Sequence, residues 1–172
     1  ALDLARGVST AARAFREGRE AWGGDGNHSA RLIGGSEIGL IGFGDLGRAL
    51  HRLLTGFGVT IRVFDPWLPD AILRGHGVVP ATLEEVMAES DTVFTVAAVT
   101  SENQGFIGAA QFAAMRAGAS FILLSRADVV DFDALMAAVG SGRIQAASDV
   151  FPEEPLAQDH PVRTLDGFLC SA

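Results

Sequence analysis

Hydrophobic and polar positions change their period several times along the chain, and each change marks the boundary of an expected element. Short runs rich in apolar or β-branched residues predict strands at 37–43, 59–64, 92–99, 119–125, 143–150 and 167–172. Apolar residues at helical spacing predict helices at 1–20, 45–57, 82–90, 108–118 and 131–142. Strands and helices therefore alternate along most of the sequence.

Two of the expected helices carry starting signals. Thr82 is followed three positions later by Glu85, the spacing of a capping box. Asp131 precedes another apolar helix and is a good N-cap residue.

This alternation predicts an α/β fold with a doubly wound parallel sheet, because strands that lack a polar side must be covered on both faces. A ligand crevice is expected at the carboxyl ends of the strands. We divide the chain into a helix at 1–20, a glycine-rich linker at 21–36 and a single α/β domain at 37–172.

Three glycines stand where the first expected strand turns into a helix, in the stretch "IGFGDLG". Gly42 permits the tight turn, Gly44 lets a pyrophosphate approach the backbone, and Gly47 lets the helix lie close to the strand. The same spacing also occurs in ordinary tight turns, so it is weak evidence alone. Asp45 adds a negative charge beside the expected phosphates, yet its N–H can donate while its side chain points away.

Asp65 supplies the second requirement of a dinucleotide site. It stands 18 residues beyond Gly47, directly after the expected strand 59–64, in "VFDPW". A carboxylate there accepts hydrogen bonds from both ribose hydroxyls and repels a 2′-phosphate, which predicts NAD rather than NADP. The alternative is a surface turn residue before Pro66. The order strand, glycines, helix, strand and acid favours the dinucleotide interpretation.

Composition narrows the classes of partner. The formal charge is −8, and all 13 cationic side chains are arginine. An acidic surface repels nucleic acid and anionic lipid, so neither is an expected partner. The one cysteine, Cys170, cannot form an internal disulfide, which is consistent with a cytoplasmic location. No apolar run is long enough to span a bilayer, the charged N-terminal segment is not a signal peptide, and no metal site is expected.

Longer motifs resemble the NAD-binding domain of the D-isomer-specific 2-hydroxyacid dehydrogenases. They are "GFGDLG", "VFDPW", "TSENQGFIGAAQFAAMRAGA", "SRADVVDFDALMAAVGSGRIQAASDVFPEEPL" and "HPVRTLDGFLCSA". The resemblance covers residues 1–172 and implies an oxidoreductase that transfers hydride between NAD(H) and the C2 carbon of a small 2-hydroxy or 2-oxo acid. It makes 1–20 the helix that joins the NAD domain to a substrate domain.

The resemblance also assigns roles to residues. Arg126 would bind the substrate carboxylate and carbonyl, and Glu154 would support a catalytic histidine. Asp149 would bond the nicotinamide carboxamide. The remaining cofactor contacts expected from the turn, the ribose acid and the resemblance are Gly42, Phe43, Gly44, Asp45, Leu46, Gly47, Asp65, Pro66, Ala97, Ala98, Asn103, Leu124 and Ser125.

The chain departs from the family pattern in ways that concern the substrate. Val96 and Ala98 stand where the family often has histidine and proline, and Ala127 and Asp128 stand where it usually has glycines. These differences leave the cofactor interpretation intact and put the identity of the substrate in doubt. The alternative for Arg126 is a surface arginine at the start of a helix.

The histidine that the family uses is expected immediately after Ala172. The four histidines present, at 28, 51, 76 and 160, are expected to be solvated rather than catalytic. The substrate domain, built in this family from both chain ends, is not in this sequence, so the 172-residue chain is expected to bind NAD without turnover.

Other functions remain open on the sequence alone. The same family includes NAD-sensing corepressors, which keep Arg126 and Glu154. A methyltransferase with a similar glycine loop would not need those two residues. A homodimer is expected, because the helix at 1–20 would otherwise expose Leu4, Val8 and Phe15.

Overall fold

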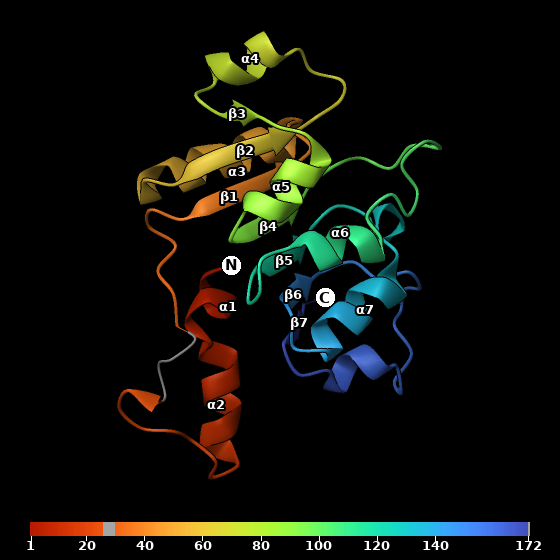
Figure 1. Ribbon diagram of the computed structural model, residues 1–172. Helices are drawn as coiled ribbons and strands as arrows, with labels where there is room; N and C mark the ends of the chain where they lie inside the picture. The colour runs from red at the N-terminus through yellow and green to blue at the C-terminus, as the bar shows by residue number, and fades with distance from the viewer. Residues whose placement is uncertain (26–29, 172) are drawn as a thin grey trace.

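Seven parallel strands form one sheet in a computed structural model that describes residues 1–25 and 30–171 (Figure 1). The strand order is β3-β2-β1-β4-β5-β6-β7. The strands are β1 (Glu37–Ile41), β2 (Thr60–Phe64), β3 (Val79–Pro80), β4 (Thr92–Thr95), β5 (Ser120–Leu123), β6 (Gln145–Ser148) and β7 (Phe168–Cys170). The predicted doubly wound parallel sheet is confirmed.

The chain changes direction across the sheet at β1. It runs outward from β1 to β2 and β3, and then returns to β4 on the opposite side of β1. In register, Ile38 of β1 lies between Ile61 of β2 and Thr92 of β4. In an open α/β sheet, ligands bind beyond the carboxyl ends of the strands at such a switch point. The fold therefore places the crevice between the loops that follow β1 and β4.

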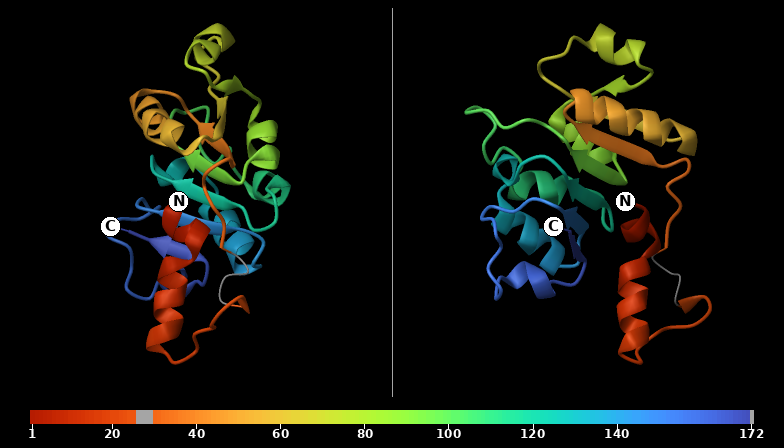
Figure 2. Two further views of the ribbon diagram at one scale, coloured as in Figure 1. Left: turned by 90° about the vertical axis from the view of Figure 1, so that its left-hand side faces the viewer. Right: turned by 180° about the vertical axis from the view of Figure 1, so that it is seen from behind.

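Helices cover both faces of the sheet, as the edge-on view in Figure 2 shows. One buried cluster joins the sheet to α5, α6 and α7, and the other joins it to α1, α3 and α4. The helices are α1 (Leu2–Arg6), α2 (Val8–Arg16), α3 (Asp45–Leu54), α4 (Asp70–Gly75), α5 (Leu83–Glu89), α6 (Ala109–Ala114) and α7 (Phe132–Gly140). Within the described ranges, no helix is long and apolar enough to cross a membrane.

Both predicted helix starts are confirmed. The Thr82 hydroxyl accepts the Glu85 N–H, and the Glu85 carboxylate accepts the Thr82 N–H. At α7, the Asp131 carboxylate accepts the Ala134 N–H at 3.0 Å.

Several predicted boundaries were wrong. The strand expected at 92–99 ends at Thr95, where its partner β1 also ends at Ile41. The helix expected at 108–118 ends at Ala114. The elements α4 and β3 were not predicted, because they are six and two residues long in a segment rich in glycine and proline. Elements this short carry too few positions to display a period.

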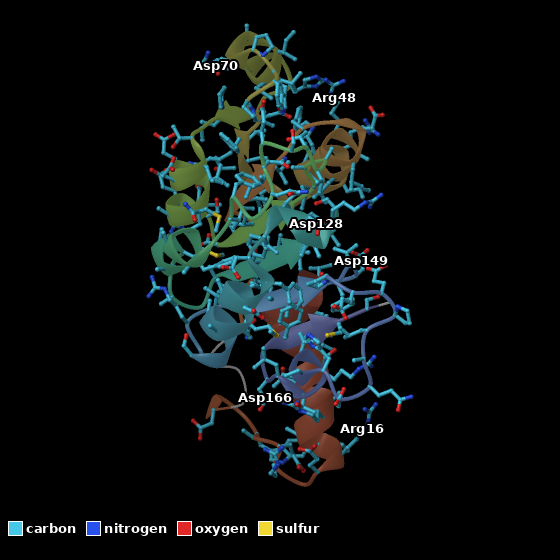
Figure 3. All side chains as sticks on the ribbon, turned by 90° about the vertical axis from the view of Figure 1, so that its right-hand side faces the viewer. Arg16, Arg48, Asp70, Asp128, Asp149 and Asp166 are labelled. Atoms are coloured by element: carbon cyan, nitrogen blue, oxygen red, sulfur yellow. The ribbon has the colours of Figure 1, made fainter. Side chains whose placement is uncertain are left out.

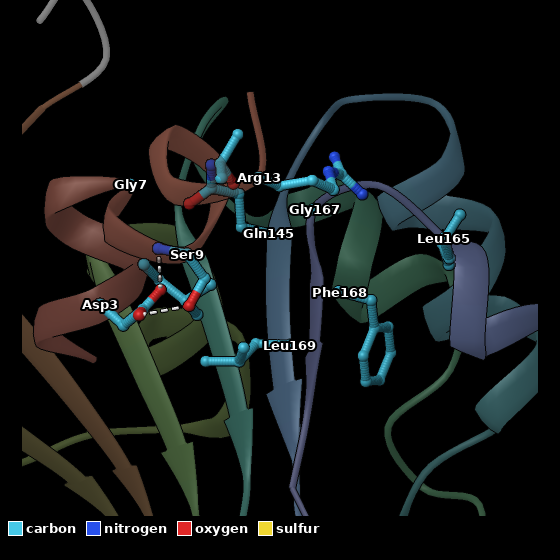
Figure 4. A pocket seen from close by; sticks show the side chains of 11 residues that line it. Asp3, Gly7, Ser9, Arg13, Gln145, Leu165, Gly167, Phe168 and Leu169 are labelled. Atoms are coloured by element: carbon cyan, nitrogen blue, oxygen red, sulfur yellow. Dashed lines mark hydrogen bonds between the residues drawn. The ribbon is translucent and has the colours of Figure 1, made fainter. Parts of the chain in front are cut away.

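The helix expected at 1–20 is two helices. Gly7 has a φ of 62° and ends α1, and α2 then begins at Val8. Asp3 holds the bend, because its carboxylate accepts both the N–H and the hydroxyl of Ser9 (Figure 4). Glycine adopts this left-handed conformation without steric cost, so the break follows from the residue type.

Helix α2 projects away from the sheet and has no buried residue (Figures 1 and 2). Arg13 forms an ion pair with Asp166 at 2.5 Å. Arg13 also lines a small pocket of about 160 Å³ together with Phe168 and Leu169 of β7 (Figure 4). Val8 and Phe15 are 57% and 61% exposed. Leu4, Val8 and Phe15 were expected to share the apolar face of one helix at 1–20. Leu4 is buried and lies on α1, whereas the other two are exposed on α2.

Candidate functional site

The glycine turn joins β1 to α3 at the switch point. Gly42 has a φ of 96°, and a Cβ added there would lie 2.8 Å from the Cα of Ala97 in the loop after β4. A Cβ on Gly47 would lie 2.6 Å from the carbonyl oxygen of Gly42. Real Cβ contacts are not this short, so both positions require glycine for close approach. The turn thus brings the loops after β1 and β4 into contact.

Gly44 differs from its two neighbours. It is the N-cap residue of α3 and has an ordinary extended backbone, and a Cβ added there would meet nothing within 4 Å. The protein itself therefore does not require glycine at this position. Open space beside a backbone at a helix N-terminus matches the requirement of a ligand phosphate that approaches the chain closely.

Asp65 holds the glycine turn in place. Its Oδ2 accepts the N–H of Phe43 at 2.7 Å, and its Oδ1 accepts the N–H of Trp67 at 3.0 Å. A carboxylate has about four acceptor positions, so two remain for ribose hydroxyls. The residue predicted as the ribose acid therefore also connects the end of β2 to the turn after β1.

A cleft of about 520 Å³ lies beside this turn. Eight of the predicted cofactor residues line it, namely Gly42, Phe43, Gly44, Asp65, Pro66, Ala97, Ala98 and Asn103. Eight further residues complete the lining, namely Ile41, Arg48, Phe64, Trp67, Leu68, Thr100, Glu102 and Phe106. The predicted residues Asp45, Leu46, Gly47, Leu124, Ser125, Arg126 and Asp149 lie outside this lining.

Asn103 shapes the loop that follows β4. Its side-chain amide donates to the carbonyl of Ala98 at 2.8 Å, and its Oδ1 accepts the N–H of Thr100 at 2.7 Å. Both bonds run along the wall of the cleft. The loop is therefore fixed by its own side chain, which keeps Ala98 at the edge of the cavity.

Arg126 follows β5 on the same edge of the sheet. Its side chain is exposed and donates to the carbonyl of Ser125 at 2.8 Å. Within the described ranges, no carboxylate lies at ion-pair distance from it. The Oγ of Ser125 is buried and has no hydrogen-bond partner. Leu124 donates its N–H to Thr95 and so ties β5 to the end of β4.

Asp149 and Glu154 follow β6, and both are exposed. Asp149 lies on the same side of the molecule as Asp128 and Arg48 (Figure 3). Glu154 accepts the N–H of Phe151 at 3.0 Å and precedes a cis peptide bond to Pro155. The two predicted acids therefore stand beyond the carboxyl end of the sheet, as Arg126 does.

Two of the histidines, His51 and His160, are less solvated than predicted. His51 and His76 each place a ring edge-on against the buried Phe43, with centroids 5.8 and 5.4 Å away. His51 is half-buried, and burial together with nearby His76 and Arg52 lowers the pKa of His51. His76 is exposed as expected.

His160 is also half-buried. It caps a short 3₁₀ helix, Pro161–Thr164, where its Nδ1 accepts the Val162 N–H. The prediction for His28 falls outside the described residues. In the described ranges, no group of three metal-ligating side chains comes together.

Comparison with known proteins decides the family. The model of the D-isomer-specific 2-hydroxyacid dehydrogenase NAD-binding domain matches residues 1–172. The chain belongs to this family. Among curated dehydrogenases, the glyoxylate reductase of Korarchaeum cryptofilum is 34% identical over 98% of this chain and 51% of its own length. The D-3-phosphoglycerate dehydrogenase of Bacillus subtilis is 32% identical over 74% of this chain and 25% of its own length.

Solved structures agree with the family assignment. A phosphoglycerate oxidoreductase from Rhizobium etli is 64% identical, with a TM-score of 0.92 over 99% of this chain and 55% of that one. An NAD-dependent formate dehydrogenase from Staphylococcus aureus, solved in complex with NAD, is 26% identical, with a TM-score of 0.89 over 99% of this chain and 51% of that one. The chain thus spans a quarter to about half of these dehydrogenases.

The cofactor of this dehydrogenase domain is NAD, and the residues of the cleft fit it. Open space at Gly44 leaves room for the pyrophosphate. Within the described ranges, two buried polar atoms have no partner: Arg48 Nε on α3, which lines the cleft, and Ser125 Oγ in the segment after β5. Sequence reasoning missed Arg48, although its place directly after Gly47 was a signal that could have drawn attention to it.

Proposed function

We propose that the protein transfers hydride between NAD(H) and the C2 carbon of a small 2-hydroxy or 2-oxo acid. The observation that carries the proposal is the exposed guanidinium of Arg126, which meets no carboxylate at ion-pair distance within the described ranges. Arg126 follows β5 at the same carboxyl edge of the sheet that holds the cofactor cleft. NAD supplies the hydride-transfer chemistry when it is bound. The relatives named above include a glyoxylate reductase, a D-3-phosphoglycerate dehydrogenase and a phosphoglycerate oxidoreductase, and nothing in them supports the corepressor alternative.

In this proposal each polar residue has one task. Arg126 binds the substrate carboxylate through two parallel hydrogen bonds and so aligns C2 with the nicotinamide. Asp65 selects NAD through the adenosine ribose, and Asp149 orients the carboxamide. Glu154 supports a histidine that exchanges the substrate proton. The single cysteine and the acidic charge remain consistent with a cytoplasmic enzyme.

The test is NADH oxidation with a panel of 2-oxo acids by the protein in its natural full length. Arg126→Gln should reduce kcat/KM by two orders of magnitude or more, roughly the effect of removing a charged, bidentate contact in a closed site. Arg126→Lys should retain only part of the kcat/KM, because an ammonium group cannot form two parallel hydrogen bonds with the substrate carboxylate. Arg74→Gln is the matched control, since Arg74 is exposed and, among the described residues, forms an ion pair with Asp70 alone.

Two results would oppose the proposal. The first is absence of turnover with every 2-oxo acid while NAD still binds, which would favour a binding protein. The second is full activity of Arg126→Gln, which would remove the residue from the substrate site.

We also propose that the chain forms a symmetric homodimer through α2. The helix has no buried residue of its own and projects from the sheet, although Val8 and Phe15 are apolar. Apolar side chains on a projecting element are covered efficiently by the same element of a second copy.

Sedimentation at high micromolar concentration should show a dimer, and Phe15→Asp should shift it to a monomer. Leu53→Asp is the control, because Leu53 is also an exposed apolar residue, on α3. A wild-type monomer, or a dimer that survives Phe15→Asp and dissociates with Leu53→Asp, would contradict the assignment to α2.

A further inference from the structure

Arg48 is a charged residue of the cofactor cleft to which the sequence analysis assigned no role. It follows Gly47 on α3, and its backbone N–H donates to Gly44 at 2.9 Å. Its side chain is half-buried and lines the cleft together with Phe43 and Trp67. Figure 3 places it at the end of the molecule that carries α4.

Among the described residues, no partner satisfies the Nε of the Arg48 guanidinium, and this atom is buried. In the part of the chain that the structure describes, Arg48 takes part in no ion pair. Buried donors in native proteins are nearly always paired, and charged donors most of all. A buried guanidinium N–H that borders a ligand cleft is therefore best explained by an acceptor on the ligand.

The charges around the cleft identify that acceptor. Arg48 is the one basic residue in the lining, whereas Asp65 and Glu102 are acidic. Asp45 adds a further negative charge in the first turn of α3. A dinucleotide brings two more negative charges on its pyrophosphate, into a site that is otherwise acidic. Only one side chain of the lining can offset them.

We propose that Arg48 binds the pyrophosphate of NAD, donating from Nε and the adjacent amino group to phosphate oxygens. A guanidinium suits this contact because its fork matches two phosphate oxygens and its charge persists at any working pH. A 2′-phosphate is the other anion that could reach an arginine here. The carboxylate of Asp65 at the ribose position repels that group, so the pyrophosphate is the assigned partner. The proposal rests on NAD binding and not on the reaction proposed above.

The experiment compares ligands that differ by their phosphates. Binding of adenosine, ADP-ribose and 2′-phospho-ADP-ribose to the 172-residue chain is measured by calorimetry, with NMR titration for the weakest ligand. Arg48→Gln should lower the affinity for ADP-ribose by about 10- to 100-fold, the usual range for loss of a hydrogen bond to a charged group. Adenosine binding should be unchanged. The salt dependence of ADP-ribose affinity should also fall, because one charge contact is lost.

Arg52→Gln is the matched control. Arg52 lies one turn later on the same helix, is exposed and does not line the cleft, so the same change of charge should leave all three affinities unchanged. Arg48→Lys should recover part of the ADP-ribose affinity, and thermal melting of each variant reports whether the fold is intact.

Three results would overturn the proposal: an unchanged ADP-ribose affinity, equal losses for adenosine and ADP-ribose, or a loss confined to the 2′-phosphorylated ligand. The last would assign Arg48 to a 2′-phosphate instead.

Discussion

The backbone at Gly44 has room for an alanine side chain, so Gly44→Ala should separate the needs of the ligand from those of the fold. A Cβ at Gly44 would meet nothing within 4 Å, and its φ of −70° is open to alanine. At Gly47 the same atom would lie 2.6 Å from the carbonyl oxygen of Gly42. We expect Gly44→Ala to lose NAD affinity at nearly constant stability, and Gly47→Ala to lose both.

The magnitudes follow from these distances. At an N-cap position, alanine stabilises the folded protein less than glycine by about 0.5–1 kcal/mol. The same substitution stabilises by about 0.4–1 kcal/mol, because alanine reduces the conformational entropy of the unfolded chain. The terms nearly cancel at Gly44. At Gly47 the atoms must separate by about 0.8 Å before ordinary contact at 3.4 Å returns, and such overpacking costs about 1–3 kcal/mol. For a domain of this size, each kcal/mol lowers Tm by about 2–4 °C.

The loss of affinity at Gly44 has another source. A methyl group beside the backbone N–H groups of the turn would keep the pyrophosphate from reaching them. Loss of one charge-assisted hydrogen bond corresponds to about 10- to 100-fold in Kd. Calorimetric titration with NAD and thermal melting of the same samples measure the two quantities together.

One outcome would refute this reasoning directly. If Gly44→Ala binds NAD as tightly as wild type, the ligand does not approach the backbone at Gly44, and the open space there has no function. A large fall in Tm for Gly44→Ala would show that the position is constrained by the protein instead. Gly56→Ala is a control for the general effect of removing a glycine, because a Cβ there also meets nothing within 4 Å.

Two further predictions concern Asp65 and His51. Asp65→Asn should weaken NAD binding and narrow the preference for NAD over NADP, because the carboxylate expected to bind the ribose is lost. It should also lower Tm, because the Phe43 and Trp67 N–H groups both donate to that carboxylate. Calorimetry with both cofactors tests the preference, and an unchanged ratio of affinities contradicts it. The pKa of His51 is lowered in the folded protein, so the unfolded chain binds the proton more readily. The contribution of His51 to the free energy of unfolding should therefore be fully present above about pH 6.5 and decline below it. Urea unfolding across that range should show a smaller decline for His51→Gln, and an equal decline contradicts the assignment.

Local pattern was sufficient for most of the fold. Apolar runs and helical spacing predicted six of the strands in the sheet, and the caps at Thr82 and Asp131 form as expected. Three glycines and an acid 18 residues later predicted the dinucleotide site. These signals succeed because backbone conformation and the side-chain period are properties of adjacent residues. The roles of Arg126, Asp149 and Glu154 depend on ligands and remain predictions.

The sequence by itself thus determined the class of fold and the presence of a turn that needs glycine. Tertiary structure alone decided what surrounds that turn. Asp65 accepts the N–H of Phe43 across 22 residues, His51 and His76 meet on the Phe43 ring, and Arg48 faces the cleft. Each of these depends on the side-by-side pairing of β1 with β2 and on the return of the chain to β4. No local period encodes that order, because strand pairing is set by which buried faces fit together after the chain has folded.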